Sequence, residues 1–307
     1  MPFTWSDKAP NRSWKIGRFD LMLSIAVPNK GRLSSKAVSI LNKIGFGIPD
    51  DPGRTLMMDI GKGRYRVLFA RADDISEFVE TGAADLGITG LDLLLESGKK
   101  VETLMPLGFG RCRLVLAVPE TSAVASAKDV EEGSRVATSF PNLTRSYFDR
   151  LGKKVEIVPV TGATELAPHI GVADLITDLT ETGSTLKMNH LRDIGTIVET
   201  QAVMIANIDS MQKKNEEIEE IKSAVSSVLN AKKKRYLMAN VPKDKLAELP
   251  MLLPGISGPT VMNIMGREDF VAVHAVADED EVNGIVTMLK SVGATGILVL
   301  PIERLIP

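Results

Sequence analysis

The feature that most limits the fold is an alternation of short apolar runs with segments of helical periodicity, which begins at Met22. Strands are predicted for the runs MLSIAVP, RYRVLFA, DLGITG, RLVLAVP, RVATSF, VEIVPV and ADLITD. Between the first two runs, apolar side chains from Leu33 to Ile44 recur on one face of a helix. Such alternation is typical of an α/β fold with largely parallel sheets, whose ligands bind at the carboxyl ends of the strands.

A second pattern follows a long amphipathic helix that is predicted from Lys213 to Ala231. The order there changes to strand, helix, strand, strand, helix, strand, with predicted bounds of 236–241, 243–249, 259–264, 270–276, 279–292 and 296–301. This βαββαβ order is that of the ferredoxin-like unit. We therefore expect a separate small domain from Lys232 onward.

Residues 1–21 are polar and show no clear period, so we expect an N-terminal arm there. They lack the apolar core of a secretion signal, and no later run approaches the ~18 apolar residues of a membrane span. The single cysteine, Cys112, excludes an internal disulfide and favours a reducing cytoplasm. A formal net charge of -2 gives no basic excess for nucleic acid. We expect a cytoplasmic protein that binds neither nucleic acid nor membrane.

The stretch ITDLTETGSTL, residues 176–186, suits a phosphate group. An apolar strand leads to the segment from Thr182 to Thr185 at an expected helix N-terminus, where backbone N–H groups and hydroxyls form an anion-binding nest. Asp174 and Asp178 supply oxygen atoms for ribose hydroxyls or for Mg²⁺. In the alternative interpretation, Thr182 or Ser184 only caps the next helix, and the local pattern does not decide between the two.

Two further polar loops follow predicted strands. PNKGRL contains Lys30, Gly31 and Arg32, and RADDI contains Arg71, Asp73 and Asp74. Cations in such loops suit a polyphosphate. Taken singly, the first loop is equally consistent with a solvated turn, and in the second Asp73 or Asp74 is a candidate helix cap.

A fourth polar segment, FPNLTRSYF, follows RVATS. Asn142 or Thr144 is the expected cap of the helix there. Arg145 in the first turn opposes the helix dipole, which favours an anionic ligand.

Together these motifs resemble the ATP phosphoribosyltransferase family, which performs the first step of histidine biosynthesis. The resemblance rests on IAVPNKGRLS, RADDI, DLGITGLDLL, GFGRCRL, PNLTRSYF and above all ELAPHIGVADLITDLTETGSTL. It extends to LLPGISGPTV and GATGILVLPIERL, and therefore covers residues 21–307. The presence of a C-terminal domain resembles the long form of the family.

The resemblance implies an enzyme that joins N1 of ATP to C1 of phosphoribosyl pyrophosphate and releases pyrophosphate. Mg²⁺ would be bound through the substrate diphosphate. The implied catalytic residues are Asp174, Asp178 and Glu165, and the implied 5-phosphate site is Thr182, Gly183, Ser184 and Thr185. The implied contacts to pyrophosphate or ATP are Lys30, Gly31, Arg32, Arg71, Asp73 and Asp74.

The resemblance also implies a two-lobed catalytic core similar to type II periplasmic binding proteins. Domain I would comprise residues 22–109 and 179–231, domain II residues 110–178, and a regulatory domain residues 232–307. That last domain would bind histidine as a feedback inhibitor, with Ile256, Gly258, Thr260 and Gly296 at the matching positions. The expected assembly is a homo-oligomer, from dimer to hexamer, with no separate regulatory subunit.

Two other functions remain as alternatives. A binding module built like a periplasmic binding protein would sense a small anion without catalysis, but the sequence has no signal peptide and carries the TGST loop. A purely regulatory small-molecule-binding protein would leave the polar loops at the strand ends unexplained.

Overall fold

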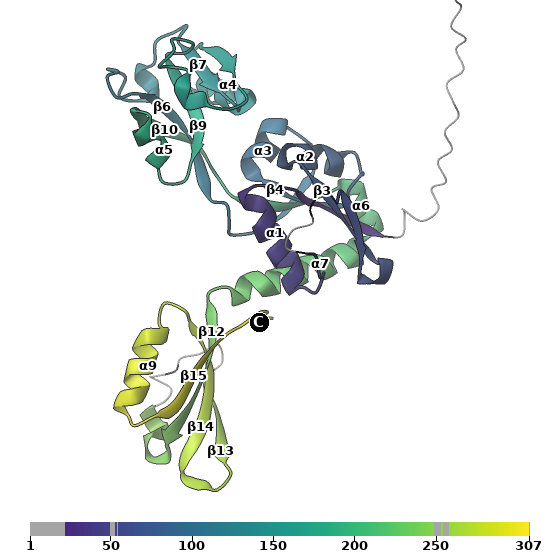
Figure 1. Cartoon of the computed structure of the whole chain (residues 1–307), viewed down its shortest axis with the longest axis vertical. Helices are drawn as coiled ribbons and strands as arrows, with labels where there is room; N and C mark the ends of the chain where they lie inside the picture. The colour runs from purple at the N-terminus through teal and green to yellow at the C-terminus, as the bar shows by residue number, and fades with distance from the viewer. Residues whose placement is uncertain (1–21, 50–52, 54, 249–252, 254–257, 307) are drawn as a thin grey trace, which may run out of the picture.

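The computed structural model describes residues 22–49, 53, 55–248, 253 and 258–306. The predicted arm, residues 1–21, and Ile256 of the predicted histidine site lie outside the described residues. Within them the chain forms three bodies, each built on its own sheet (Figure 1).

The first lobe contains a six-stranded sheet with the order β2-β3-β1-β4-β11-β5. Its strands are β1 (Leu23–Pro28), β2 (Met57–Ile60), β3 (Tyr65–Ala70), β4 (Leu86–Gly90), β5 (Glu102–Pro106) and β11 (Ala202–Ala206). Its helices are α1 (Arg32–Lys43), η1 (Gly61–Gly63), α2 (Ala72–Glu80), α3 (Leu91–Ser97), α6 (Ile208–Lys213) and α7 (Asn215–Ala231). The apolar faces of α1 and α7 pack with the sheet in one core.

The second lobe contains a five-stranded sheet with the order β10-β6-β9-β7-β8. Its strands are β6 (Cys112–Pro119), β7 (Arg135–Thr138), β8 (Glu156–Pro159), β9 (Leu175–Thr180) and β10 (Leu191–Thr200). Its helices are η2 (Ala127–Asp129), α4 (Pro141–Arg150), η3 (Thr164–Leu166) and α5 (Ser184–Met188).

Both sheets are mixed, which corrects the prediction of largely parallel sheets. In the first lobe β1 pairs in parallel with β3 and β4, whereas β11 runs antiparallel to β4 and β5. In the second lobe β7 pairs in parallel with β8 and β9, whereas β6 runs antiparallel to β9 and β10. The chain crosses between the lobes twice. The strand that follows each crossing, β6 or β11, runs antiparallel to the strands beside it.

The predicted boundary between the lobes is also corrected. Residues 179–231 were expected in domain I, but β10 pairs along its length with β6 of the second sheet. The chain returns to the first sheet only at β11, from Ala202. The physical reason is that β10 is half exposed and largely polar, so the sequence LRDIGTIVET contains no apolar run to mark it as a strand.

A buried ion pair attaches the last helices to the first sheet. Asp85, 5% exposed, accepts hydrogen bonds from Ser210 Oγ at 2.6 Å, from Ser24 N at 2.8 Å and from Lys214 Nζ at 2.9 Å. Burial acts to raise the pKa of Asp85, but these bonds outweigh it and lower the pKa. The network joins β1, the start of β4 and the α6–α7 region.

The C-terminal domain confirms the predicted ferredoxin-like order. Its antiparallel sheet has the order β13-β14-β12-β15, with β12 (Lys234–Pro242), β13 (Thr260–Ile264), β14 (Arg267–Asp278) and β15 (Thr295–Pro301). The helical segments are η4 (Lys243–Glu248), a 3-10 turn where a helix was expected, and α9 (Val282–Ser291).

The chain beyond β15 returns to the first lobe, beside α7 (Figure 1). Leu305 N donates to Ser227 O at 2.8 Å, and Arg304 Nε donates to Ser227 Oγ at 2.9 Å. The small domain is therefore attached to α7 twice, through β12 and through this C-terminal tail.

Candidate active site

A cleft of about 290 Å³ lies where strands of both lobes end. Its lining comes from the loops after β1, β3, β4, β7 and β9 and from the crossing segment before β6. Its lining residues include Lys30, Gly31, Arg32, Asp92, Arg111, Cys112, Phe140, Leu179 and Glu181. Because the carboxyl ends of parallel strands meet at one edge of a sheet, the cleft occupies the expected position for a ligand.

The loop after β1 brings cations to the first-lobe wall. Gly31 has a φ of 83° and immediately precedes α1, and Lys30 and Arg32 flank it in the cleft. Arg32 NH1 lies 3.1 Å from Glu181 Oε2 of the second lobe, with both side chains more than half exposed. An ion pair so exposed contributes little to stability, so the guanidinium is available to an anionic ligand.

The loop between β9 and α5 combines a left-handed glycine with three hydroxyl side chains, and it contains features of both the phosphate nest and the helix cap. Gly183, the N-cap residue of α5, is left-handed, with a φ of 79°, and the Ser184 N–H that follows it makes a long hydrogen bond of 3.4 Å to Thr182 Oγ1. The Gly183 N–H donates to Thr180 Oγ1 at 2.8 Å, and Thr182 Oγ1 donates to Ser184 Oγ at 3.0 Å. The first N–H groups of a helix have no partner within it. Those of Ser184 and Thr185 therefore lie in the part of the loop predicted to hold phosphate.

Asp178 and Glu165 lie close together in the second lobe. Asp178 is half-buried in β9, and burial raises its pKa, with the nearby Glu165 carboxylate acting in the same direction. Leu179 N donates to Asp178 Oδ1 at 2.7 Å. Leu179 and Glu181 line the cleft. Asp178 and Thr180 alternate with them along the chain, and the Thr180 hydroxyl accepts a hydrogen bond from Gly183 N.

Asp174 does not join this group, which corrects the predicted pairing of Asp174 with Asp178. It precedes β9, and four residues of extended strand separate the two carboxylates by roughly 13 Å. Arg135 NH2 donates to Asp174 Oδ1 at 2.7 Å and Arg135 N donates to Asp174 Oδ2 at 2.8 Å. These bonds lower the pKa of Asp174. Asp174 therefore lies at the opposite end of β9 from Thr180.

The RADDI loop forms the start of α2. Arg71 is the N-cap residue and is exposed, and Asp73 and Asp74 lie in the first turn without a capping hydrogen bond. Their charges suit the positive end of the helix dipole. The negative charge of Asp73 also acts to raise the pKa of Asp92, which lines the cleft. The first turn of α2 is therefore close enough to influence the charge of the cleft.

Sequence reasoning assigned no role to Asp92, Arg111 or Cys112, although DLGITGLDLL and GFGRCRL contain them. Asp92 is 7% exposed, and Thr200 Oγ1 donates to its Oδ1 at 2.7 Å. Burial raises the pKa of Asp92, and the charge of Asp73 adds to this effect. An acidic residue directly after a buried, glycine-rich strand end was the available signal.

The crossing segment carries Arg111 and Cys112 past the cleft. Both also line a second hollow of about 350 Å³ on the same crossing, together with Glu181 and Gln201. Burial raises the pKa of the Cys112 thiol to about 11. The thiol is therefore protonated at neutral pH and is a poor nucleophile.

The predicted histidine positions do not come together within one chain. Gly258 and Thr260 lie at the start of edge strand β13, and Gly296 lies in the opposite edge strand, β15. Three strand spacings separate these edges by roughly 14 Å. Gly258 and Thr260 therefore lie at the edge of the sheet opposite to that of Gly296.

No group of three His, Cys, Asp or Glu side chains that could hold a metal ion occurs in the ranges that the structure describes. Mg²⁺ is usually bound by one or two carboxylates together with substrate phosphates and water. Asp92 and Glu181 in the cleft fit that smaller requirement. Over the same ranges, no helix has the length and apolarity to span a membrane.

The class of the protein follows from two features, the cations on one wall of an interlobe cleft and the helix that begins after a left-handed glycine on the other lobe. This is a two-lobed α/β protein whose cleft suits phosphate-bearing ligands.

Comparison with known proteins identifies the family. The ATP phosphoribosyltransferase family matches residues 71–227, and the HisG C-terminal domain matches residues 231–304. The ATP phosphoribosyltransferase of Methanocaldococcus jannaschii is 49% identical over 93% of this chain and 100% of its own length. That of Methanothermobacter thermautotrophicus is 47% identical over 94% and 100%. The chain belongs to the ATP phosphoribosyltransferase family, in its long form, and is an enzyme of the first step of histidine biosynthesis.

Solved structures agree with this assignment. The ATP phosphoribosyl transferase (HisG:HisZ) complex from Thermotoga maritima has a TM-score of 0.61 and 31% identity, and covers 68% of this chain and 99% of that chain. The periplasmic aliphatic sulphonate binding protein of Escherichia coli also matches, with a TM-score of 0.44 and 16% identity over 68% of this chain and 74% of that chain. The matches to the family models over the catalytic region and the C-terminal domain confirm the predicted fold class and the resemblance to the long form.

Proposed function

We propose that the chain transfers the phosphoribosyl group of phosphoribosyl pyrophosphate to N1 of ATP and releases pyrophosphate. The observation that carries the proposal is the start of α5, where a left-handed Gly183 lies between Thr182 and Ser184, and the Ser184 N–H makes only a long hydrogen bond of 3.4 Å to Thr182 Oγ1. We assign the ribose 5-phosphate to this turn, with Thr182, Ser184 and Thr185 supplying hydroxyl and backbone donors. A helix N-terminus favours such a dianion through its N–H groups and its dipole.

The diphosphate groups would meet the cationic wall. Lys30 and Arg32 lie in the cleft, and Arg71 stands at the neighbouring strand end. Breaking the bond between C1 and pyrophosphate develops negative charge on the leaving group, which these cations would stabilise. When bound through the diphosphate, Mg²⁺ would neutralise part of the same charge. Gly31 would let the backbone approach the phosphates, and Asp73 and Asp74 would order this wall around them.

Asp178 and Glu165 would act on the sugar. As C1 loses pyrophosphate, positive charge develops on the ribose, and a nearby carboxylate stabilises it. The half-buried Asp178 stands two residues before Thr180, whose hydroxyl already binds the phosphate turn. The protein's other task is to orient two polyphosphates, and orientation alone supplies ~7 to 11 kcal/mol in favourable cases.

The C-terminal domain would provide feedback inhibition by histidine. We assign Gly258, Thr260 and Gly296 to this site, shared between copies of the chain because these positions lie on opposite sheet edges. A homo-oligomer, from dimer to hexamer, would then be required for regulation. Since the domain is part of the chain, no separate regulatory subunit would be needed. Cys112 as a single thiol suits a reducing cytoplasm.

Replacing Gly183 with Asp tests the phosphate assignment. The substitution brings a carboxylate and an unfavourable left-handed backbone to the turn, so affinity for phosphoribosyl pyrophosphate should fall at least about 10- to 100-fold, given ~1.5–3 kcal/mol for each charged hydrogen bond lost. Titration calorimetry measures the affinity. Gly152→Asp is the matched control, because Gly152 is also left-handed, with a φ of 69°, but lies after α4. Equal affinity in the Gly183 variant and the control would place the phosphate elsewhere.

A further inference from the structure

Glu96 of α3 in the first lobe caps a helix of the second lobe. Its Oε1 accepts Asn142 N–H at 2.9 Å, and its Oε2 accepts Leu143 N–H at 2.9 Å. Its backbone carbonyl accepts Asn142 Nδ2 at 3.0 Å. One glutamate therefore makes three hydrogen bonds across the lobe boundary, to the first turn of α4.

The receiving helix has no cap of its own. Phe140 is the N-cap residue of α4, Pro141 follows it, and no side chain of the N-cap binds the first turn. The expected caps are not used in that way: the Asn142 side chain binds Glu96, and Thr144 is buried against Thr177 at 2.7 Å. The N–H groups of α4 are thus satisfied from the other lobe.

The position of Glu96 is unfavourable for its own helix. It lies in the last turn of α3, where the negative end of the helix dipole disfavours a carboxylate. The positive end of α4 compensates this charge. A contact that is unfavourable within one lobe and favourable between two lobes indicates a role in their relative placement.

We propose that Glu96 is a positioning residue that holds the second lobe in register with the cationic wall of the cleft. α4 begins directly after Phe140, and Phe140 lines the cleft opposite Lys30 and Arg32. We call the three hydrogen bonds between Glu96 and α4 the latch. The latch lies at the side of the cleft and sets the width of the cleft before the substrates bind. This inference rests on the proposed function, because it requires the substrates to bind between the lobes.

The latch predicts a specific kinetic change. Without Glu96, the substrates must themselves bring the lobes together, so the apparent affinity falls by the fraction of molecules that are correctly placed. Once the substrates are bound, the geometry is restored and kcat is kept. KM for both substrates should rise by about 5- to 30-fold in Glu96→Ala, the factor that corresponds to loss of a helix cap. The rise should be smaller in Glu96→Gln, which keeps one oxygen acceptor.

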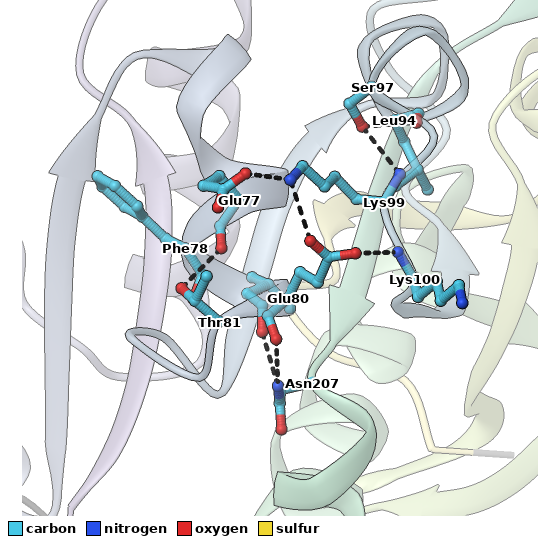
Figure 2. A network of polar contacts seen from close by, with 10 residues as sticks. Glu77, Phe78, Glu80, Thr81, Leu94, Ser97, Lys99, Lys100 and Asn207 are labelled. Carbon is cyan, nitrogen blue, oxygen red and sulfur yellow. Dashed lines mark hydrogen bonds and ion pairs between the residues drawn. The ribbon is translucent and has the colours of Figure 1, made fainter.

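Glu80 provides a matched control within the first lobe. Its carboxylate also accepts a backbone N–H, from Lys100 at 2.7 Å, and a Lys99 Nζ contact at 3.0 Å, while Asn207 Nδ2 donates to its carbonyl at 3.2 Å. Figure 2 shows these partners around Glu80, all contributed by the first lobe. Glu80→Gln should therefore change local stability and leave KM unaltered.

Amide hydrogen exchange tests the latch directly in the intact protein. In Glu96→Ala, the amides of Asn142 and Leu143 should exchange faster than in the unaltered chain whether or not substrates are present, because their acceptor is gone. In Glu96→Gln, which keeps one acceptor oxygen, they should also exchange faster, and ATP with phosphoribosyl pyrophosphate should restore part of their protection. In Glu80→Gln only the region of Lys100 should exchange faster. A merely structural loss in the first lobe would not expose these two amides of α4.

The outcomes separate the two proposals. If the unaltered chain catalyses the reaction but the Glu96 variants keep its KM and its exchange pattern, the latch is overturned. If KM falls in those variants, Glu96 occludes the cleft rather than holding it, which also overturns the latch. If the unaltered chain shows no transfer at all, the proposed function fails, whereas faster exchange in the Glu96 variants would still support the contact itself.

Discussion

At the scale of single residues, two aspartates four positions apart have opposite environments. Asp174 meets Arg135 in two hydrogen bonds, and its pKa is lowered. Asp178 is half-buried near Glu165, and its pKa is raised. A carboxylate whose charged form is disfavoured by burial, and that stands next to the loop proposed to bind phosphate, is suited to a positively charged transition state rather than to holding the fold.

This contrast predicts stability effects of opposite sign. For Asp178 the native state keeps its proton to a higher pH than the unfolded chain, so the residue costs stability as the pH rises from the usual aspartate pKa through its raised pKa. Asp178→Asn should therefore raise Tm at pH 7, with a difference that shrinks on acidification, while abolishing most activity. The Tm of Asp178→Asn and that of the unaltered chain are compared by circular dichroism at intervals of ~1 pH unit, from about pH 4 to about pH 7.

Asp174→Asn is the paired control. The lowered pKa of Asp174 contributes stability that is present above the usual aspartate pKa and is lost as the pH falls through the lowered value. Tm should therefore fall at pH 7 in this variant, with activity kept. A lower Tm at pH 7 for Asp178→Asn would contradict the assignment of a strained carboxylate.

At the scale of elements, the sequence predicts strands that contain a short apolar run. The runs that became β1, β3, β4, β6, β7, β8 and β9 were all expected, and β8 is the one of these seven without a buried residue. Strands β2, β5 and β10 have exposed or half-exposed faces, so packing against neighbours defines them and no run marks them. β11, with five buried residues, did carry a readable run, AVMIA, that the interpretation left out.

The same limit applies to the site. Loops that follow buried strands could be placed at the cleft from the sequence, as the positions of Lys30 and Arg32 show. The partner of a helix start could not, because Glu96 is 46 residues from Asn142 along the chain. The predicted run ADLITD does place Asp174 at its start and Asp178 at its end, so the rise of an extended strand already separates the two carboxylates.

At the scale of the whole molecule, the third body is an addition to a complete core. The Thermotoga maritima chain covers 68% of this chain with 99% of its own length, so a chain of that extent folds without the third domain. Here β12 and the tail that binds Ser227 attach the domain to α7, which packs with α1 in the first core. The loop with Lys30 and Arg32 leads directly into α1, so α1 borders the cleft and also packs against α7.

Truncation tests whether this domain carries regulation. A chain ending at Ala231 should keep transferase activity and lose inhibition by histidine, because Gly258, Thr260 and Gly296 are then absent. Initial rates with and without histidine, for the truncated and the full chain at equal concentration, measure the effect. Inhibition that persists in the truncated chain would place the effector in the catalytic lobes.

The central claim is the transfer itself, and the most direct measurement is the ultraviolet spectrum of the adenine during the reaction. The full chain is mixed with ATP, phosphoribosyl pyrophosphate and Mg²⁺, and released pyrophosphate is quantified in parallel. Substitution at N1 should change the adenine absorbance in step with pyrophosphate release, and omission of either substrate should abolish both signals. An unchanged spectrum without pyrophosphate release, in a folded protein, would contradict the account.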